Sequence, residues 1–482
     1  MFIGIDIGTS EVKVLLLAPD HTVVGTCGSA LTVSRPHPGH SEQSPQDWWT
    51  ATCTALAQLR EMHPAEYAAA QGIGLSGQMH GAVLLDAQDQ VLRPAILWND
   101  TRAAQECVDM MAALPQLPAL AGSLAMPGFT APKLLWVARH EPQLFQRVAK
   151  VLLPKDYVRL MLTGEYISDM SDASGTLWLD VQKRAWSDEL LALTQLTQAH
   201  MPRLVEGSEP GGTLRADVAQ ALGLPPGIVV AGGAGDNAAS AVGMGAVQAG
   251  QGFLSLGTSG VLFVVTPSYQ PNAASATHAF CHALPQQWHQ MSVMLSAASA
   301  LQWVSDLLGA PHAGAVAEKA AALSLAERAA SPLFLPYLGG ERTPHNDASV
   351  RGSLHGLSFD TDAARLGYAV IEGVTFGLKD GLAALHAAGS TVNRLSLVGG
   401  GARSAFWAQL LASALNVDIV THGSSAVGGA LGAARLAWLA TGADPGAVCR
   451  SPEVEASYHP DAAEQDLLAT RYAHFRSLYR PA

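Results

Sequence analysis

The chain opens on alternating apolar residues that predict a β-hairpin. Ile3, Ile5 and Ile7 alternate with small or polar residues, and the apolar run Val12–Leu17 follows a Gly-Thr-Ser turn. A period of two is typical of a half-buried strand, so the pattern predicts two antiparallel strands joined by that turn. The same unit recurs about half a chain further on as "FLSLGTSGVLFVV". The repeat predicts two domains of related plan, each beginning on such a hairpin.

Predicted strands and helices alternate between and after the two hairpins. "SPQDWWTATCTALAQL" predicts a helix with Ser44 as N-cap and Pro45 at its first position. "GIGLSGQMHGAVLLD" predicts a second hairpin, with strands at residues 73–76 and 82–85. "GIVVAGG" predicts a buried strand over residues 228–231, followed by a helix start. This alternation indicates an α/β fold with helices on both faces of a sheet.

The last third of the chain adds three further elements to this plan. "RLSLVGGGARSAFWAQLLASAL" predicts strand, glycine turn and helix, and "AVGGALGAARLAWLA" predicts a helix of small residues that packs closely. "EVEASYHPDAAEQDLLATRYAHFRSLY" predicts a terminal helix, which we expect to pack back across the domains.

Length and charge limit the classes of protein that fit. A chain of 482 residues is too long for one hydrophobic core, so at least two domains are expected. The formal net charge is -12, and no run of basic residues occurs. Nucleic acid and anionic membrane surfaces are therefore excluded as expected partners. An anionic ligand would need backbone dipoles, a helix N-terminus or a metal ion.

Cysteine usage and the terminus predict a cytoplasmic protein. The five cysteines are scattered and fit neither a disulfide framework nor a zinc motif, which favours buried, reduced thiols. The start "MFIGIDIGTS" has no basic leader, and no apolar run approaches the ~20 residues of a membrane span.

Each Gly-Thr-Ser turn is a candidate phosphate site. Successive backbone N–H groups in such a turn form a concave nest that binds phosphate oxygens without a positive charge. An ordinary tight hairpin turn is the alternative for either turn taken alone. The candidate ATP-binding residues of the two turns are Gly8, Thr9, Ser10, Gly257, Thr258 and Ser259.

Two aspartates stand at predicted strand ends. Asp6 precedes the first turn, where its charge would repel a phosphate unless Mg²⁺ bridges the two. Asp236, in "GGAGDNAAS", lies between a buried strand and a helix start, with no Lys or Arg beside it. The alternatives are a turn cap for Asp6 and a helix N-cap for Asp236.

These segments together resemble the FGGY carbohydrate kinases of the actin-like ATPase superfamily, over essentially the whole chain. The marks are "GIDIGTS", "SGQMHG", "LRPAILWNDTR", "MPGFTAPKLLWV", "GGAGDNAAS", "LSLGTSG", "FLPYLGGERTPH" and "VGGGARS". The family's second signature, around residues 352–372, is met except at Arg365. The resemblance implies two RNase H-like domains around a central cleft. We place them at residues 1–240, binding the sugar, and 241–482, binding ATP.

The resemblance also implies roles for individual residues. Asp236 falls on the family's catalytic aspartate, the general base that takes the proton of the attacking sugar hydroxyl. Asp6 and Asp236 are then the expected Mg²⁺ residues. Met79 and His80 fall on a sugar-contacting pair, although a lone histidine is more often structural. By the same resemblance, the residues expected to bind the adenosine part of ATP are Gly400, Gly401 and Arg403.

A second polar and aromatic group, Trp98, Asn99 and Asp100, is a further sugar-binding candidate. A tryptophan face suits the C–H surface of a sugar, and amide and carboxylate groups suit its hydroxyls. A core tryptophan followed by a helix-capping Asn-Asp pair explains the same residues nearly as well.

The implied activity is ATP-dependent phosphorylation of D-xylulose to D-xylulose 5-phosphate, a step of pentose catabolism, with Mg²⁺ as cofactor and ATP as co-substrate. The alternatives are another ketose or polyol as acceptor (ribulose, gluconate or glycerol) and, from a different class, an actin- or chaperone-like ATPase. The sequence does not decide the oligomeric state, and a homodimer is among the assemblies it allows.

Overall fold

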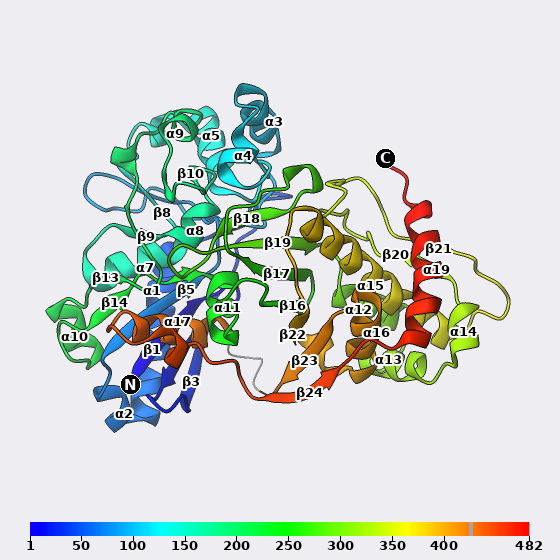
Figure 1. Cartoon of the computed structure of the whole chain (residues 1–482). Helices are drawn as coiled ribbons and strands as arrows, with labels where there is room; N and C mark the ends of the chain where they lie inside the picture. The colour runs from blue at the N-terminus through cyan, green and yellow to red at the C-terminus, as the bar shows by residue number, and fades with distance from the viewer. Residues whose placement is uncertain (424–427, 482) are drawn as a thin grey trace.

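The computed structural model describes residues 1–423 and 428–481, and in this part of the chain two seven-stranded sheets stand one in each half (Figure 1). Each sheet contains one of the two predicted hairpins. The first joins β1 (Phe2–Ile7) to β2 (Glu11–Leu17), and the second joins β16 (Gly252–Leu256) to β17 (Gly260–Thr266). Both hairpin predictions are confirmed, as is the α/β alternation.

The N-terminal sheet combines an antiparallel meander with a parallel part. β1 pairs with β2 and β2 with β3 in antiparallel fashion, whereas β5 pairs in parallel with β1, β14 and β15. The remaining strands of this sheet are β3 (Val23–Ala30), β5 (Gly72–Gly77), β13 (Pro210–Thr213), β14 (Val229–Ala231) and β15 (Ala234–Gly235). Four two-stranded ladders accompany it: β4 (Glu42–Gln43) with β7 (Ala95–Ile96), β6 (Val83–Leu85) with β8 (Lys150–Leu152), β9 (Ile167–Asp169) with β12 (Arg203–Val205), and β10 (Leu179–Asp180) with β11 (Ala185–Trp186).

The first half also contains helices of different lengths, the longest of which is α1. They are α1 (Pro45–Met62), α2 (Pro64–Ala68), α3 (Ala104–Ala113), α4 (Leu117–Ala121), α5 (Thr130–His140), α6 (Pro142–Phe145), α7 (Pro154–Thr163), α8 (Met170–Ser174), α9 (Asp188–Ala192), η1 (Gln198–His200), α10 (Ala216–Leu222) and α11 (Asp236–Met244). The predicted cap of α1 is confirmed, because Ser44 is its N-cap and Pro45 its first residue.

The C-terminal sheet is also mixed. Its other strands are β18 (His278–Cys281), β19 (Trp288–Met294), β22 (Arg394–Val398), β23 (Asp418–His422) and β24 (Val454–Tyr458), and β20 (Leu333–Leu335) pairs separately with β21 (Ser353–His355). Its helices are η2 (Ala273–Ser275), α12 (Ala298–Leu307), α13 (Ala313–Ala321), α14 (Leu325–Ala329), α15 (Ala363–Ala387), η3 (Gly400–Arg403), α16 (Ala405–Leu415), α17 (Gly428–Leu439), α18 (Pro445–Val448) and α19 (Ala462–Leu478). Across residues 1–423 and 428–481, none of the helices combines the length and the apolar character that crossing a membrane requires.

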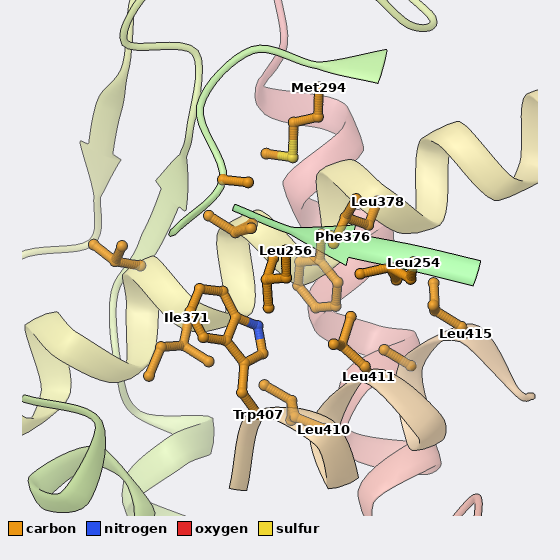
Figure 2. Packing of buried hydrophobic residues seen from close by; sticks show 14 of the residues in the cluster. Leu254, Leu256, Met294, Ile371, Phe376, Leu378, Trp407, Leu410, Leu411 and Leu415 are labelled. Carbon is orange, nitrogen blue, oxygen red and sulfur yellow. The ribbon is translucent and has the colours of Figure 1, made fainter. Parts of the chain in front are cut away.

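The core of the second half is built around Trp407 of α16 (Figure 2). Its indole packs beside Ile371 and Leu256, and its Nε1 donates a hydrogen bond of 3.1 Å to Thr375 Oγ1 of α15. A buried tryptophan needs such an acceptor for its N–H. The contact joins α16 to the long helix α15 beneath the second hairpin.

Helix α17 belongs to the second half by sequence but packs on the first sheet (Figure 1). Glycines make this possible: a Cβ at Gly4 of β1 would lie 1.9 Å from the carbonyl oxygen of Ala430, and one at Gly74 of β5 would lie 1.8 Å from that of Ala433. Backbone therefore touches backbone, a separation that only glycine permits. The two halves are joined by this close contact.

Three sequence predictions differ from the structure. "GIGLSGQMHGAVLLD" is not a hairpin, because β5 pairs with β1, β14 and β15 whereas β6 pairs with β8. The terminal segment contains the edge strand β24 before its helix. The helix that returns to the first sheet is α17, while the contacts of the last helix, α19, include α14, α15, α16 and β20. Apolar periodicity does not identify the partner of a strand or helix. Residues 426–427 of the predicted small-residue helix lie outside the described residues.

We predict that Gly74→Ala destabilises the protein by about 1–3 kcal/mol, because its methyl group must push α17 away from β5. Chemical denaturation measures the change. Gly423→Ala is the matched control, since among the described residues a Cβ there meets nothing within 4 Å. Equal stability of the two variants would show that the close contact between α17 and β5 is unimportant.

Candidate functional site

Two carboxylates meet at one edge of the N-terminal sheet. In the parallel register Asp6 of β1 stands opposite Ser76 of β5, and Ser76 stands opposite Ala234 of β15. Asp236 follows β15 directly and begins α11. Because the carboxyl ends of parallel strands lie at the same edge, Asp6 and Asp236 face the same region. Ser76 Oγ donates a hydrogen bond of 2.8 Å to Asp6 Oδ1.

Asp236 does not act as the N-cap of its own helix. The N-cap is Gly235, and the carboxylate of Asp236 accepts hydrogen bonds from the backbone N (2.7 Å) and the side-chain Nδ2 (3.0 Å) of Asn237. Burial, and then the charge of Asp6, raise the pKa of Asp236 to about 6. A carboxylate with that pKa is ionised at neutral pH and can still accept a proton, as a general base must.

Asp6 is enclosed by the first turn of α17. A Cβ at Gly429 would lie 2.6 Å from Asp6 Oδ2, so glycine at this position lets the helix approach the carboxylate. The positive end of the helix dipole faces a negative group there, which is favourable. Burial raises the pKa of Asp6, and the hydrogen bond from Ser76 opposes that effect.

The two carboxylates suit a divalent cation that keeps most of its water. Among the described residues, no group of three or more His, Cys, Asp or Glu side chains could hold a metal ion. Mg²⁺ is commonly bound by one or two carboxylates together with waters and substrate phosphates. Asp6 and Asp236 therefore fit Mg²⁺ brought by a nucleotide, and they do not form a protein-only metal cage.

The first Gly-Thr-Ser turn presents unused backbone donors. Gly8 N donates to the carbonyl oxygen of Glu11 (3.0 Å) and closes the turn. In the described part of the chain, the N–H groups of Thr9 and Ser10 donate to no protein group. Adjacent free N–H groups of this kind form the nest that a phosphate needs.

The second turn has the same organisation. Gly257 N donates to the carbonyl oxygen of Ser259 (3.1 Å), and the N–H groups of Thr258 and Ser259 have no acceptor among the described residues. The start of α12 holds the turn from behind: Ala297 N donates to Thr258 O (3.0 Å), and Ala298 N to Gly257 O (2.8 Å). The carbonyls are thereby occupied while the donors stay available.

Gly400, Gly401 and Arg403 line a cavity of about 400 Å³ between η3 and helices α12, α13 and α16. A Cβ at Gly401 would lie 2.4 Å from Leu256 Cδ2, so glycine lets η3 sit against the end of β16, beside the second turn. The cavity has the size of a small-molecule site and adjoins a phosphate nest. It is suited to the base and ribose of a nucleotide.

Met79 and His80 lie in the loop that follows β5. Met79 is buried against Gly235, where a Cβ would stand 2.9 Å from its Sδ. His80 Nδ1 lies 2.7 Å from the carbonyl oxygen of Gly175, which can only accept, so Nδ1 carries a proton. Burial lowers the pKa of His80 to about 3, despite that hydrogen bond. A neutral His80 leaves Nε2 as an acceptor for a ligand hydroxyl.

Trp98, Asn99 and Asp100, which come shortly after β7, have different environments. Trp98 is 48% exposed, and its Nε1 donates to Thr9 Oγ1 (3.0 Å). Asn99 Oδ1 is buried and, within the described residues, has no hydrogen-bond partner. Trp98 thus offers an exposed ring face to a ligand, and Asn99 offers an acceptor oxygen that is free among the described residues.

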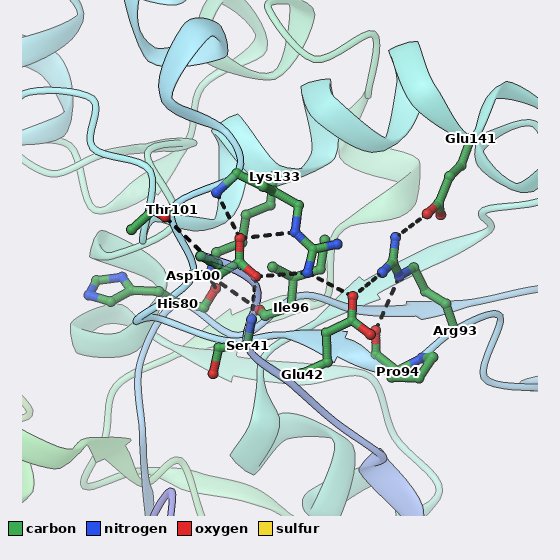
Figure 3. A network of polar contacts seen from close by, with 12 residues as sticks. Ser41, Glu42, His80, Arg93, Pro94, Ile96, Asp100, Thr101, Lys133 and Glu141 are labelled. Carbon is green, nitrogen blue, oxygen red and sulfur yellow. Dashed lines mark hydrogen bonds and ion pairs between the residues drawn. The ribbon is translucent and has the colours of Figure 1, made fainter. Parts of the chain in front are cut away.

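Asp100 does not share this availability. Its carboxylate is buried, pairs with Arg102 at 2.7 Å and accepts a hydrogen bond of 2.6 Å from Ser41 N (Figure 3). Despite burial, these hydrogen bonds lower the pKa of Asp100. Asp100 is thus held in a structural ion pair, and it does not cap the following helix, because the N-cap of α3 is Ala103.

Sequence reasoning left two polar residues near the sugar side without a role. Gln78 precedes the Met79-His80 pair and forms hydrogen bonds with Thr9 and Gly8 of the first turn. Arg342 of the "GGERTPH" segment lies close enough for its charge to contribute, after burial, to the lowered pKa values of His80 and His278. Among described residues its guanidinium has no hydrogen bond or ion pair. The sequence signal for Arg342 was its position within the glycine-containing segment "GGERTPH".

Comparison with known proteins agrees with this geometry. The model of the FGGY family of carbohydrate kinases, N-terminal domain, matches residues 1–243, and that of the C-terminal domain matches residues 252–441. Over 485 residues the chain is 52% identical to a xylulose kinase of Escherichia coli (strain K12), covering 100% of this chain and 99% of the relative. A xylulose kinase of Klebsiella pneumoniae is 50% identical, covering 99% and 98%. The crystal structure of a "xyloylose kinase" from Brucella ovis superposes with a TM-score of 0.96 at 53% identity, covering 99% and 98%.

We predict that Asp6→Asn lowers the pKa of Asp236, because the charge of Asp6 is one cause of its elevation. The pKa should remain above the ordinary aspartate value, since burial is the larger cause. Carboxyl-carbon NMR titration measures it directly. Asp466→Asn, a change on the exposed surface of α19, is the control and should leave it unchanged. An unaltered titration in Asp6→Asn would contradict the coupling of the two carboxylates.

Proposed function

Because this chain belongs to the FGGY family of carbohydrate kinases, we propose that it transfers the γ-phosphoryl group of ATP to D-xylulose. The chain is an ATP-dependent carbohydrate kinase with sugar and ATP as substrates. Its identity of 50% and 52% to xylulose kinases over the full length supports xylulose as the acceptor and D-xylulose 5-phosphate as the product. The reaction is a step of pentose catabolism.

One observation carries the proposed mechanism: Asp236 stands at the carboxyl edge of the sheet beside Asp6, with a pKa of about 6. Its carboxylate accepts the proton of the C5 hydroxyl as that oxygen attacks the γ-phosphorus. The bond from phosphorus to the β–γ bridging oxygen breaks in line, and ADP leaves. Phosphoryl transfer requires positioning and charge stabilisation more than covalent help, so one oriented base is sufficient.

The two nests and the glycine-lined cavity account for ATP. Thr9 and Ser10 in one half, and Thr258 and Ser259 in the other, offer free N–H groups to its phosphates. The adenosine part occupies the cavity at η3. Main-chain donors suit an acidic protein, since they bind an anion without requiring basic side chains.

Mg²⁺ fits beside the phosphates, where it would neutralise part of their charge during transfer. Asp6 and Asp236 are the residues that would hold it, with water completing its coordination. This arrangement also removes the repulsion between Asp6 and a phosphate in the first turn.

The sugar lies against Met79, His80 and Trp98 in the proposed complex. His80 Nε2 accepts a hydrogen bond from a sugar hydroxyl, and the exposed face of Trp98 covers the C–H surface of the sugar. Closure of the two domains excludes water, which otherwise competes with the C5 hydroxyl as phosphoryl acceptor.

Asp236→Asn should lower kcat for sugar phosphorylation by about 10²–10⁴-fold, the usual contribution of general base catalysis. The amide cannot accept the proton, yet it keeps the size and the contacts of the side chain. Affinity for a non-hydrolysable ATP analogue should change little. The control is Asp466→Asn. Wild-type turnover in Asp236→Asn would remove this residue from the mechanism.

A panel of acceptors tests the sugar. D-xylulose should give the highest kcat/KM in an ATP-consumption assay, ahead of ribulose, gluconate and glycerol. Preference for another acceptor would reassign the substrate within the family. ATP hydrolysis that is indifferent to every sugar would instead favour an actin- or chaperone-like ATPase. The cytoplasmic location and homodimeric state stay predictions, which cell fractionation and molecular mass in solution test.

A further inference from the structure

The indole of Trp98 connects the sugar side of the site to the first phosphate turn. Trp98 follows β7, and its Nε1 donates to Thr9 Oγ1 at 3.0 Å, while 48% of the residue stays exposed. Indole has one N–H donor, so this bond determines how the ring stands relative to the turn. A ligand that contacts the exposed face therefore acts on a group already bonded to the turn.

A second connection comes from Gln78, which is 3% exposed and immediately precedes the Met79-His80 pair. Thr9 Oγ1 donates to Gln78 Oε1 (3.1 Å), and Gln78 Nε2 donates to the carbonyl oxygen of Gly8 (3.2 Å). One hydroxyl thus accepts from Trp98 and donates to Gln78, and it joins the two segments that carry the sugar-binding candidates.

Gln43 completes the support of the turn. Its Nε2 donates to the carbonyl oxygen of Thr9 (2.8 Å), and its Oε1 accepts from Gln78 Nε2 (3.1 Å) and from Trp48 Nε1 (3.1 Å). The carbonyls of Gly8 and Thr9 and the Thr9 hydroxyl are therefore all occupied by side chains. What remains for a phosphate is the pair of free N–H groups.

We propose that the hydrogen-bonded chain Trp98–Thr9–Gln78 couples sugar binding to phosphate binding at the first turn. Sugar held against Trp98 and the Met79-His80 pair stabilises the turn in the form whose N–H groups donate hydrogen bonds to the phosphates. By linkage, bound nucleotide tightens sugar binding by the same factor. Trp98 and Gln78 are positioning residues in this respect, and the inference rests on the proposed sugar kinase function.

Coupling of this kind also limits the hydrolysis of ATP in the absence of sugar. A turn that is held more firmly when sugar is bound gives productive phosphate binding chiefly when an acceptor is available, so water replaces the sugar less often as the phosphoryl acceptor. A purely structural role for the same bonds predicts something else: lower stability, with the mutual effect of the two ligands unchanged.

The test compares D-xylulose affinity with and without a non-hydrolysable ATP analogue, by calorimetry on the full chain with Mg²⁺. Trp98→Phe keeps a smaller aromatic face and removes the N–H donor. Wild-type protein should bind the sugar about 5- to 150-fold more tightly with the analogue present, the usual range for coupled sites. In Trp98→Phe that ratio should fall below about twofold, and sugar-independent ATP hydrolysis should rise relative to transfer.

Two further variants make the result decisive. Gln78→Met, close in size but without either polar group, should lower the ratio in the same way. Trp438→Phe, in the last turn of α17 where the ring stacks on Phe2, is the matched control and should keep the wild-type ratio. Thermal melting of each variant separates lost coupling from lost stability.

The outcomes separate this inference from the proposed function. The coupling is overturned if the ATP analogue raises sugar affinity in Trp98→Phe and Gln78→Met as much as in the wild type. It is also overturned if the analogue does not raise sugar affinity in the wild type. Either result counts even if D-xylulose is phosphorylated. A wild-type protein that neither binds nor phosphorylates D-xylulose overturns the substrate assignment. The coupling is then measured with whichever acceptor the panel selects, by the same ratio and the same criterion.

Discussion

Parallel pairing of β1 with β5 and of β5 with β15 is the constraint on which the rest of the site depends. It brings Asp6 and Asp236, 230 positions apart in the chain by their numbers, to one sheet edge. Glycines on β1, β5 and α17 allow the backbones to come close enough to bury both carboxylates partly. Two acids held in this way repel one another, and a proton or a cation relieves that repulsion. The fold thus gives Asp236 a raised pKa, the feature on which the proposed general base and the proposed Mg²⁺ site rest.

In the proposed complex, backbone groups bind the phosphates of ATP and side chains bind the sugar. The phosphates meet main-chain N–H groups in two turns, one from each half, whose carbonyls are already bonded from behind. Acid–base chemistry and sugar contacts are assigned in this proposal to side chains at strand ends. This division suits a protein with a net charge of -12, in which a cluster of basic residues near the phosphates would be exceptional.

Local pattern was sufficient to predict the turns that we propose as phosphate sites, and insufficient to predict long-range partners. The two hairpins, the cap of α1 and the strand–turn–helix at η3 follow from periodicity and turn residues, which act over a few positions. The pairing of β5 with β1, and the packing of α17 on the first sheet, depend on contacts between segments far apart. The periodicity of apolar residues does not encode these long-range contacts, although the glycines at positions 4 and 74 mark where the backbones touch.

The same limit explains which candidate site residues could be recognised by their position and which environments could not be predicted. Asp6 and Asp236 stand at strand ends, where a carboxylate is easily noticed. Asp100 stands at a similar position, but its partner Arg102 and the backbone of Ser41 enclose it, and no spacing rule distinguishes the two situations. Gln78 was passed over because its importance lies in bonds to residues about 35 and 70 positions away.

A crystal structure with D-xylulose and a non-hydrolysable ATP analogue bound together tests whether Asp236 is the general base. We expect one carboxylate oxygen of Asp236 within about 2.6–3.2 Å of the C5 hydroxyl, with that hydroxyl in line with the γ-phosphorus. A sugar bound with its C5 hydroxyl remote from Asp236, or an Asp236 side chain turned into solvent, would contradict it.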